Sequence, residues 1–146
     1  MNAFALRAAV LAAAFLTAPP ALAQVAPAPV TAEYYYRIKW GSHEEFKELY
    51  KRNHEPILKE LQKQGFITAM RMESPFTHLA GGTRWDLRVT ITYRDPSSAV
   101  QVGGPFDKAS DAVTARLYPD KAKLDAEEQR RFSLLEEHWD VIVVGE

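Results

Sequence analysis

A strictly alternating segment near the middle of this 146-residue chain constrains its fold more than any other feature. Between Arg84 and Tyr93 every second side chain is apolar; the apolar positions are Trp85, Leu87, Val89, Ile91 and Tyr93. Successive side chains of a β-strand point to opposite faces, so the pattern predicts a strand with one covered face and one open face. Such a strand is typical of an antiparallel sheet that is covered on one side only.

The other elements can be placed around this strand. Further strands are predicted at 33–40, 66–73 and 139–144. Residues 43–65 have helical spacing, and Pro56 removes one backbone hydrogen bond there, which predicts a kink near Asn53. A second helical region, broken by glycine and proline, is predicted at 96–102, 106–117 and 120–137. The order β-α-β-β-α-β predicts an α+β, ferredoxin-like sandwich, in which helices cover one face of a four-stranded antiparallel sheet.

Residues 1–23 have the three parts of a secretory signal peptide. One arginine precedes an apolar run at 8–16, and a small-residue cleavage site ends at Ala23. We expect cleavage after Ala23 and export, to a periplasm or out of the cell. Residues 24–32 are rich in proline and alanine and are expected to form a flexible leader. A single domain is then expected over 33–146.

Composition excludes several classes of partner. The formal net charge is −1 and there is no basic block, so neither nucleic acid nor, after signal removal, a membrane surface is an expected partner. The chain has no cysteine, which excludes disulfides and thiolate metal sites. Its four histidines are not at metal-ligand spacing, and no glycine-rich segment matches a phosphate loop. We therefore expect no metal and no cofactor.

Two polar residues border the apolar face of the long predicted helix. Asn53 and His54 lie on either side of a stripe that is centred close to Ile57. A histidine in this position is a candidate catalytic residue, because it can exchange a proton near neutral pH, and Asn53 is a candidate for orienting a ligand carbonyl. The alternative is that both side chains satisfy backbone groups loosened by Pro56, or that they lie at the solvent edge.

Aromatic residues are concentrated on the face of the predicted sheet that the helices cover. Tyr36, Trp40 and Trp85 are candidates for the wall of a flat apolar pocket, with Met70 as an adaptable part of that wall. A ring-shaped ligand would fit such a pocket. The alternative is that these side chains belong to the core.

Short motifs along the chain resemble the dimeric α/β-barrel superfamily of ferredoxin-like domains, and most closely its NIPSNAP and EthD-type families. The motifs are at 36–41, Phe46, 54–56, 65–66 and 85–93. The resemblance implies a homodimer in which two sheets pack face to face, with a ligand between each sheet and its own helices. The haem-degrading branch of the superfamily carries an asparagine on its first strand, which this chain lacks.

The opposite face of the predicted sheet is polar. It carries Arg37, Lys39, Arg84, Asp86, Arg88, Thr90 and Thr92. The family-like interpretation is a dimer interface closed by ion pairs between subunits; the alternative is a solvated face. The resulting hypothesis is an exported homodimer that binds a small apolar or aromatic molecule, with cofactor-independent monooxygenase- or isomerase-like catalysis as one role. A non-catalytic structural or interaction dimer is the alternative.

Overall fold

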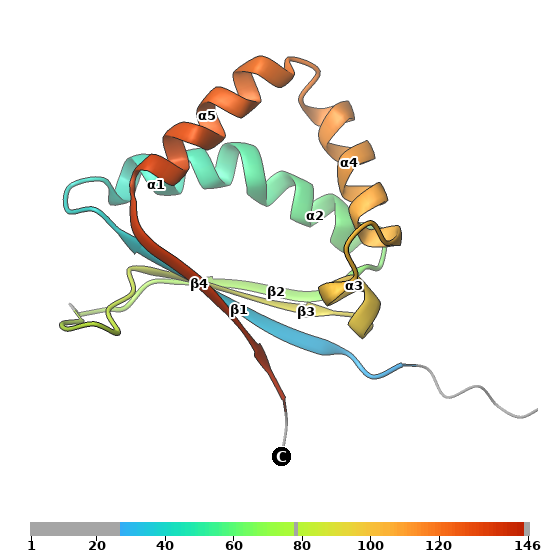
Figure 1. Ribbon diagram of the computed structural model, residues 1–146, viewed down its shortest axis with the longest axis horizontal. Coiled ribbons are helices and arrows are strands. Elements are labelled where there is room, and N and C mark those ends of the chain that lie inside the picture. Colours follow the sequence, from blue (N-terminus) through green and yellow to red (C-terminus); the bar gives the residue numbers. More distant parts are fainter. Residues whose placement is uncertain (1–26, 78, 145–146) are drawn as a thin grey trace, which may run out of the picture.

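The computed structural model describes residues 27–77 and 79–144. The predicted signal peptide and the first residues of the predicted leader lie outside the described residues. Within them the chain forms one antiparallel sheet with the longer helices on one side and one short helix beside the strand ends (Figure 1). The elements in chain order are β1 (Val30–Ile38), α1 (His43–Leu49), η1 (Tyr50–His54), α2 (Glu55–Lys63), β2 (Ile67–Glu73), β3 (Leu87–Tyr93), α3 (Pro96–Val100), α4 (Pro105–Leu117), α5 (Lys121–Ser133) and β4 (Leu135–Val143).

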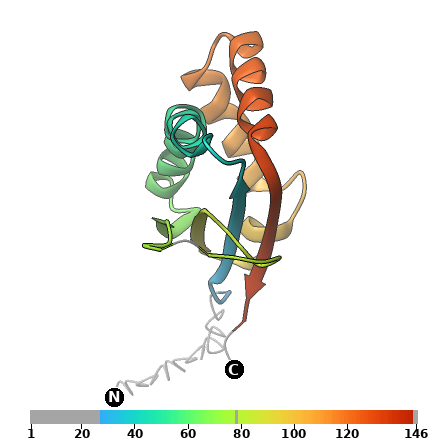
Figure 2. The ribbon, with the colours of Figure 1, turned by 90° about the vertical axis from the view of Figure 1, so that its left-hand side faces the viewer.

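The sheet has the strand order β2-β3-β1-β4 and is open, with β2 and β4 at its edges. The central strand β1 pairs antiparallel with both neighbours, and Tyr36 lies opposite Leu87 on one side and His138 on the other. Figure 2 views the sheet nearly edge-on and shows one face covered by the helical layer. The predicted fold class, a ferredoxin-like α+β sandwich, is confirmed.

The core fills the space between the sheet and the helices α1 and α2. Phe46 and Leu61 are fully buried beneath these helices, and Val89 is buried on the sheet below them. In β3 buried residues alternate with half-buried ones, as the sequence pattern predicts. No helix in residues 27–77 and 79–144 is long and apolar enough to cross a bilayer.

The predicted kink near Asn53 is present as a π-helix, η1, between α1 and α2. At this point the backbone N–H of Glu55 donates to the carbonyl of Tyr50, five residues earlier. Pro56 follows in the first turn of α2, where a missing N–H is tolerated. The α1–η1–α2 unit therefore continues across the sheet with one widened turn, a feature that is frequent at functional sites.

Several strand boundaries differ from the sequence-based expectation, including the start of β3 at Leu87. β1 begins at Val30 because Ala32 pairs with strands on both sides and is buried, so part of the predicted leader belongs to the sheet. β1 ends at Ile38, since the N–H of Ser42 donates to the carbonyl of Lys39 and closes a turn over Gly41, where φ is 78°. β4 begins at Leu135, four residues early, because α5 ends at Ser133.

Candidate functional site

A cavity of about 230 Å³ lies between the sheet and the α1–η1–α2 unit, and we call it the inner cavity. Its lining residues are Tyr34, Tyr36, Tyr50, His54, Ile57, Leu58, Leu61, Ile91, Tyr93, Phe106 and Ser110. The sheet supplies tyrosines from β1 and β3, η1 supplies His54, and α2 supplies the aliphatic wall. The inner cavity is thus apolar, with a few polar groups directed into it, as is usual for small-molecule sites.

Two of the lining tyrosines are paired with each other. The hydroxyl oxygens of Tyr34 and Tyr93 are 2.7 Å apart and share a hydrogen bond. Burial raises the pKa of both phenols, so both stay protonated at neutral pH. This pair forms a neutral polar wall on the sheet side of the inner cavity.

Three further polar groups in the lining have no such partner. Among the described residues, no hydrogen bond reaches the hydroxyl of Tyr36, the hydroxyl of Tyr50 or the imidazole of His54. Tyr36 and Tyr50 are almost completely buried. Burial raises the pKa of Tyr36 to about 12 and raises that of Tyr50 as well, so both hydroxyls are donors at neutral pH. None of their polar atoms is among the fully buried unpaired atoms of the described residues, so all three groups face accessible space in the inner cavity.

The environment of His54 keeps its imidazole neutral. Burial is the main cause that lowers its pKa from 6.5 to about 4, and the positive charge of Arg131 lowers it further. His138 acts in the same direction, while Glu128 opposes it. The ring lies edge-on to Tyr50, with 5.1 Å between the ring centroids. At pH 7 His54 therefore presents one donor and one acceptor nitrogen.

Arg131 is a buried cation beside this site that the sequence did not indicate. Only 2% of the residue is exposed, and its guanidinium lies over the rings of Phe46, Tyr50 and Phe132. It forms an ion pair with Glu128, three residues earlier, but its Nη1 has no hydrogen-bond partner among the described residues. A Glu–Arg pair at this spacing is typical of an exposed helix face, so no local signal marks the burial.

Of the predicted site residues, only Tyr36 and His54 line the inner cavity. Asn53 is buried but faces α5, where its Nδ2 donates to Oε2 of Glu127 over 2.9 Å. Met70 is half-buried on β2 and packs against the core without lining the inner cavity. Asn53 contacts α5 and His54 lines the inner cavity, so these two consecutive residues have different neighbours.

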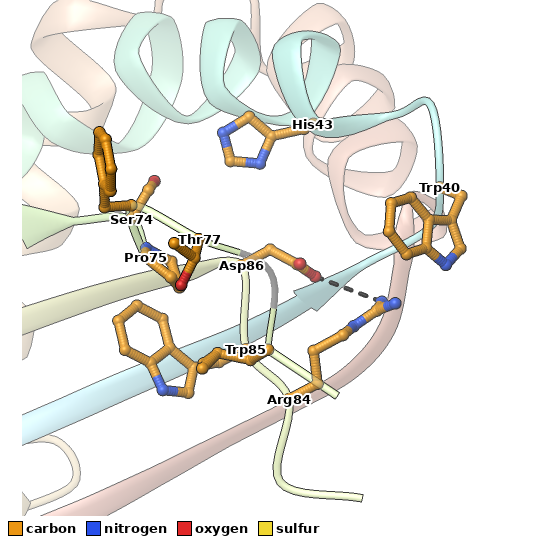
Figure 3. Close-up of a pocket in the computed structure, with 10 residues that line it drawn as sticks. Trp40, His43, Ser74, Pro75, Thr77, Arg84, Trp85 and Asp86 are labelled. Atoms are coloured by element: carbon orange, nitrogen blue, oxygen red, sulfur yellow. Dashed lines mark ion pairs between the residues drawn. The ribbon is translucent and has the colours of Figure 1, made fainter. Parts of the chain in front are cut away.

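Trp40 and Trp85 were expected on the same wall as Tyr36, and that placement is wrong. Both line a separate hollow of about 210 Å³ at the end of the sheet, together with His43 and Asp86 (Figure 3). Trp40 lies in the turn after β1, is 74% exposed and is covered by the guanidinium of Arg84. Trp85 precedes the first residue of β3, so the alternation no longer fixes its side.

Trp85 instead joins an aromatic cluster on the face of the sheet opposite the helices, which we call the outer face. Tyr35 stacks on Trp139 with 5.3 Å between ring centroids, and Trp85 meets Tyr35 edge-on. The guanidinium of Arg88 lies 5.3 Å from the centroid of Trp85. These three aromatic residues line an outer hollow of about 590 Å³.

The charged residues of the outer face already have partners within the chain. Arg88 pairs with Glu73 at 2.8 Å, and Arg84 pairs with Glu136 at 3.1 Å. Arg37 pairs with Glu137 in the same way. Carboxylates on neighbouring strands of the same chain therefore already pair with these arginines.

The described residues contain no group of three carboxylate or histidine side chains that could hold a metal ion. The polar groups of the inner cavity are phenols and one imidazole, and its remaining wall is mostly apolar. Such a lining suits an uncharged organic molecule with an oxygen function better than it suits a cation.

No family model matches the sequence, and no curated protein matches it. A solved dimeric ferredoxin-like protein from an uncultured marine organism is similar, with a TM-score of 0.51 and 8% identity over 82% of this chain and 90% of the other. An EthD family protein from Bacillus halodurans has a TM-score of 0.49 and 17% identity over 81% and 99%. A NIPSNAP family protein from Agrobacterium tumefaciens has a TM-score of 0.44 and 13% identity over 86% and 92%.

At these identities the likeness concerns the fold. The similar solved structures are ferredoxin-like proteins that include EthD and NIPSNAP family members, as the sequence motifs predict. Their similarity assigns no ligand and no reaction to this chain.

Proposed function

We propose that the protein is a homodimer that binds a small, uncharged, largely apolar molecule in the inner cavity. The observation that carries the proposal is the set of three polar groups, on Tyr36, Tyr50 and His54, that line one cavity without a hydrogen bond to any described residue. These groups face accessible space in the cavity, so a ligand that pairs with them replaces water and gains about 0.5–1.5 kcal/mol for each hydrogen bond.

The lining defines the chemistry of this ligand. Ile57, Leu58 and Leu61 present an aliphatic wall that suits a ring or a short hydrocarbon chain. The hydroxyls of Tyr36 and Tyr50 are donors, which suit a carbonyl or hydroxyl oxygen on that body. A ligand that combines an apolar ring with one oxygen function uses both parts of the site.

The state of His54 favours binding over acid–base turnover. A general base works best when its pKa lies near the working pH, and burial holds the pKa of His54 at about 4. A neutral imidazole with so low a pKa is a good hydrogen-bond acceptor but a weak proton acceptor. We therefore assign His54 to ligand recognition, as the acceptor for a ligand hydroxyl.

A phenolic probe tests this assignment. We expect 2-naphthol to bind the wild-type protein and raise its melting temperature more than naphthalene does, because only the phenol can donate to His54. His54→Phe should weaken 2-naphthol binding roughly tenfold, the effect of one lost hydrogen bond of about 1.4 kcal/mol. His43→Phe is the matched control, since His43 lies outside the inner cavity. Equal affinity of both variants for 2-naphthol, or no binding to wild type, would contradict the proposal.

The homodimer is proposed to form through the outer face. The in-chain ion pairs leave this face close to charge-neutral, and its aromatic cluster of Tyr35, Trp85 and Trp139 is only half-buried in one chain. Val141 and Val143, each 47% exposed, extend the apolar surface along β4. The similar marine protein is described as dimeric. A two-fold contact would bury this surface and give the open sheet a second cover.

Export is proposed from the N-terminal sequence pattern alone. We expect the protein recovered from its native host to begin at Gln24, because signal peptidase cleaves after a small-residue site such as the one that ends at Ala23. Intact-mass spectrometry measures the N-terminus directly. A mass that includes residues 1–23 would overturn the proposal, whereas Ala23→Asp should block processing of an exported chain.

A further inference from the structure

The π-helix that carries His54 also contacts side chains from the end of α4 and from α5. In a regular helix the carbonyl of Arg52 would accept a hydrogen bond from the N–H of residue 56, but Pro56 has none. The hydroxyl of Tyr118, at the end of α4, donates to this carbonyl over 2.6 Å. A side chain at the end of another helix thus supplies the hydrogen bond that the proline cannot donate.

The next residue of η1 is held from the same direction. Asn53 is 2% exposed, and its Nδ2 donates to Glu127 of α5 over 2.9 Å. The guanidinium of Arg52 lies 3.2 Å from the other oxygen of the same carboxylate. Tyr118 and Glu127 therefore bind two consecutive residues of the widened turn, Arg52 and Asn53. We call these contacts the corner latch. Tyr118, Leu124 and Glu127 line a groove beside these contacts, so the latch is partly open to solvent.

His54 follows directly after Arg52 and Asn53 but has no comparable contact with α4 or α5. No hydrogen bond to a described residue fixes its ring, and its one close aromatic neighbour is Tyr50, which belongs to the same turn. Its direction into the inner cavity is therefore set by the backbone of η1. A π-turn is wider than a regular α-turn, so conversion of η1 to an α-turn would rotate the following side chain around the helix axis.

We propose that Tyr118 and Glu127 are positioning residues that keep His54 directed into the inner cavity by stabilising the π-helix. This inference rests on the proposed function, because the latch has this role only if His54 binds a ligand in the inner cavity. The corner between α4 and α5 then belongs to the site although it touches no ligand.

The latch is tested on the free protein by an NMR titration of the His54 imidazole. Tyr118→Phe removes one hydroxyl, and Glu127→Ala removes the acceptor of Asn53. Each should raise the pKa of His54 by about one unit, since a ring released toward solvent loses part of its desolvation penalty. Removal of the negative charge of Glu127 would by itself lower that pKa, so a rise reports the change of position.

Two further variants separate positioning from general stability. Glu45→Ala is the matched control, because it removes the carboxylate that pairs with Arg130 at 2.6 Å and so breaks another α1–α5 ion pair away from η1. It should leave the pKa of His54 unchanged. Glu127→Gln keeps an oxygen for Asn53 but lacks the negative charge, so it should not raise the pKa of His54 above the wild-type value. An unchanged pKa in Tyr118→Phe and Glu127→Ala, or an equal rise in Glu45→Ala, would overturn the inference. Failure of 2-naphthol to bind would overturn the proposed function without affecting this titration.

Discussion

Replacement of Trp139 by alanine is expected to convert the proposed dimer into a monomer at micromolar concentration. The indole, on the edge strand β4, stacks on Tyr35 of the central strand β1 in the aromatic cluster of the outer face and is only half-buried in one chain. Large aromatic residues at the centre of an interface contribute most to affinity, about 2–4 kcal/mol on truncation. This loss corresponds to a Kd about 30- to 900-fold weaker. Sedimentation equilibrium over a range of concentrations measures the change.

The control for this experiment is an exposed aromatic residue on the helical side. Phe132 on α5 is 50% exposed and lies on the covered side of the sheet. Phe132→Ala should leave the dimer intact, while circular dichroism should show that both variants remain folded. A wild-type protein that is monomeric at high micromolar concentration would remove the proposed interface. A dimer that survives Trp139→Ala would place the contact elsewhere.

The interface illustrates what alternation in a sequence can and cannot predict. The pattern at 84–93 predicts an antiparallel sheet with one open face, and the structure confirms this. Which aromatic residues meet on that face depends on register, and the Tyr35–Trp139 pair arises only because β1 and β4 align Tyr35 with Trp139. Neither segment alone predicts this register, and a shift of one residue in the pairing would move every side chain of the strand to the opposite face.

The ends of strands limit prediction in the same way. Trp40 and Trp85 fit the alternation of the strands next to them, but each lies just outside the observed strand. Trp40 lies in the turn over Gly41 that follows β1, and Trp85 lies in the segment before β3 begins. Periodicity fixes the face of a side chain only while the backbone remains extended.

Local backbone chemistry was the more reliable guide around the site. Pro56 predicts an irregular turn near Asn53, where the structure has a π-helix, and it removes the usual helical donor to the carbonyl of Arg52, which accepts from a side chain instead. The partner of that carbonyl, Tyr118, lies 66 residues away in the sequence. Such partners depend on how α4 and α5 pack, which explains why the corner latch and the buried guanidinium of Arg131 left no signal in the sequence.

Acidification is expected to destabilise the protein through His54. The pKa of its imidazole is about 4 in the folded chain and about 6.5 in an unfolded one. As the pH falls below 6.5 the unfolded state takes up a proton first, so the free energy of unfolding decreases. The loss is complete near pH 4, below which both states are protonated. One pKa unit corresponds to 1.36 kcal/mol, so we expect His54 to account for about 1–3 kcal/mol.

Urea unfolding of wild type and His54→Phe at pH 7 and pH 4.5 isolates this contribution. Other groups also titrate in acid; the N-cap carboxylate of Asp95, for example, has a pKa lowered by its hydrogen bond from the Ser98 backbone. Their effect is common to both proteins and cancels in the difference. The wild type should lose more stability than His54→Phe between the two pH values, by most of the expected amount. Parallel losses in the two proteins would show that His54 titrates normally and is not held neutral in the inner cavity. Its assignment as the neutral acceptor for a ligand would then fail.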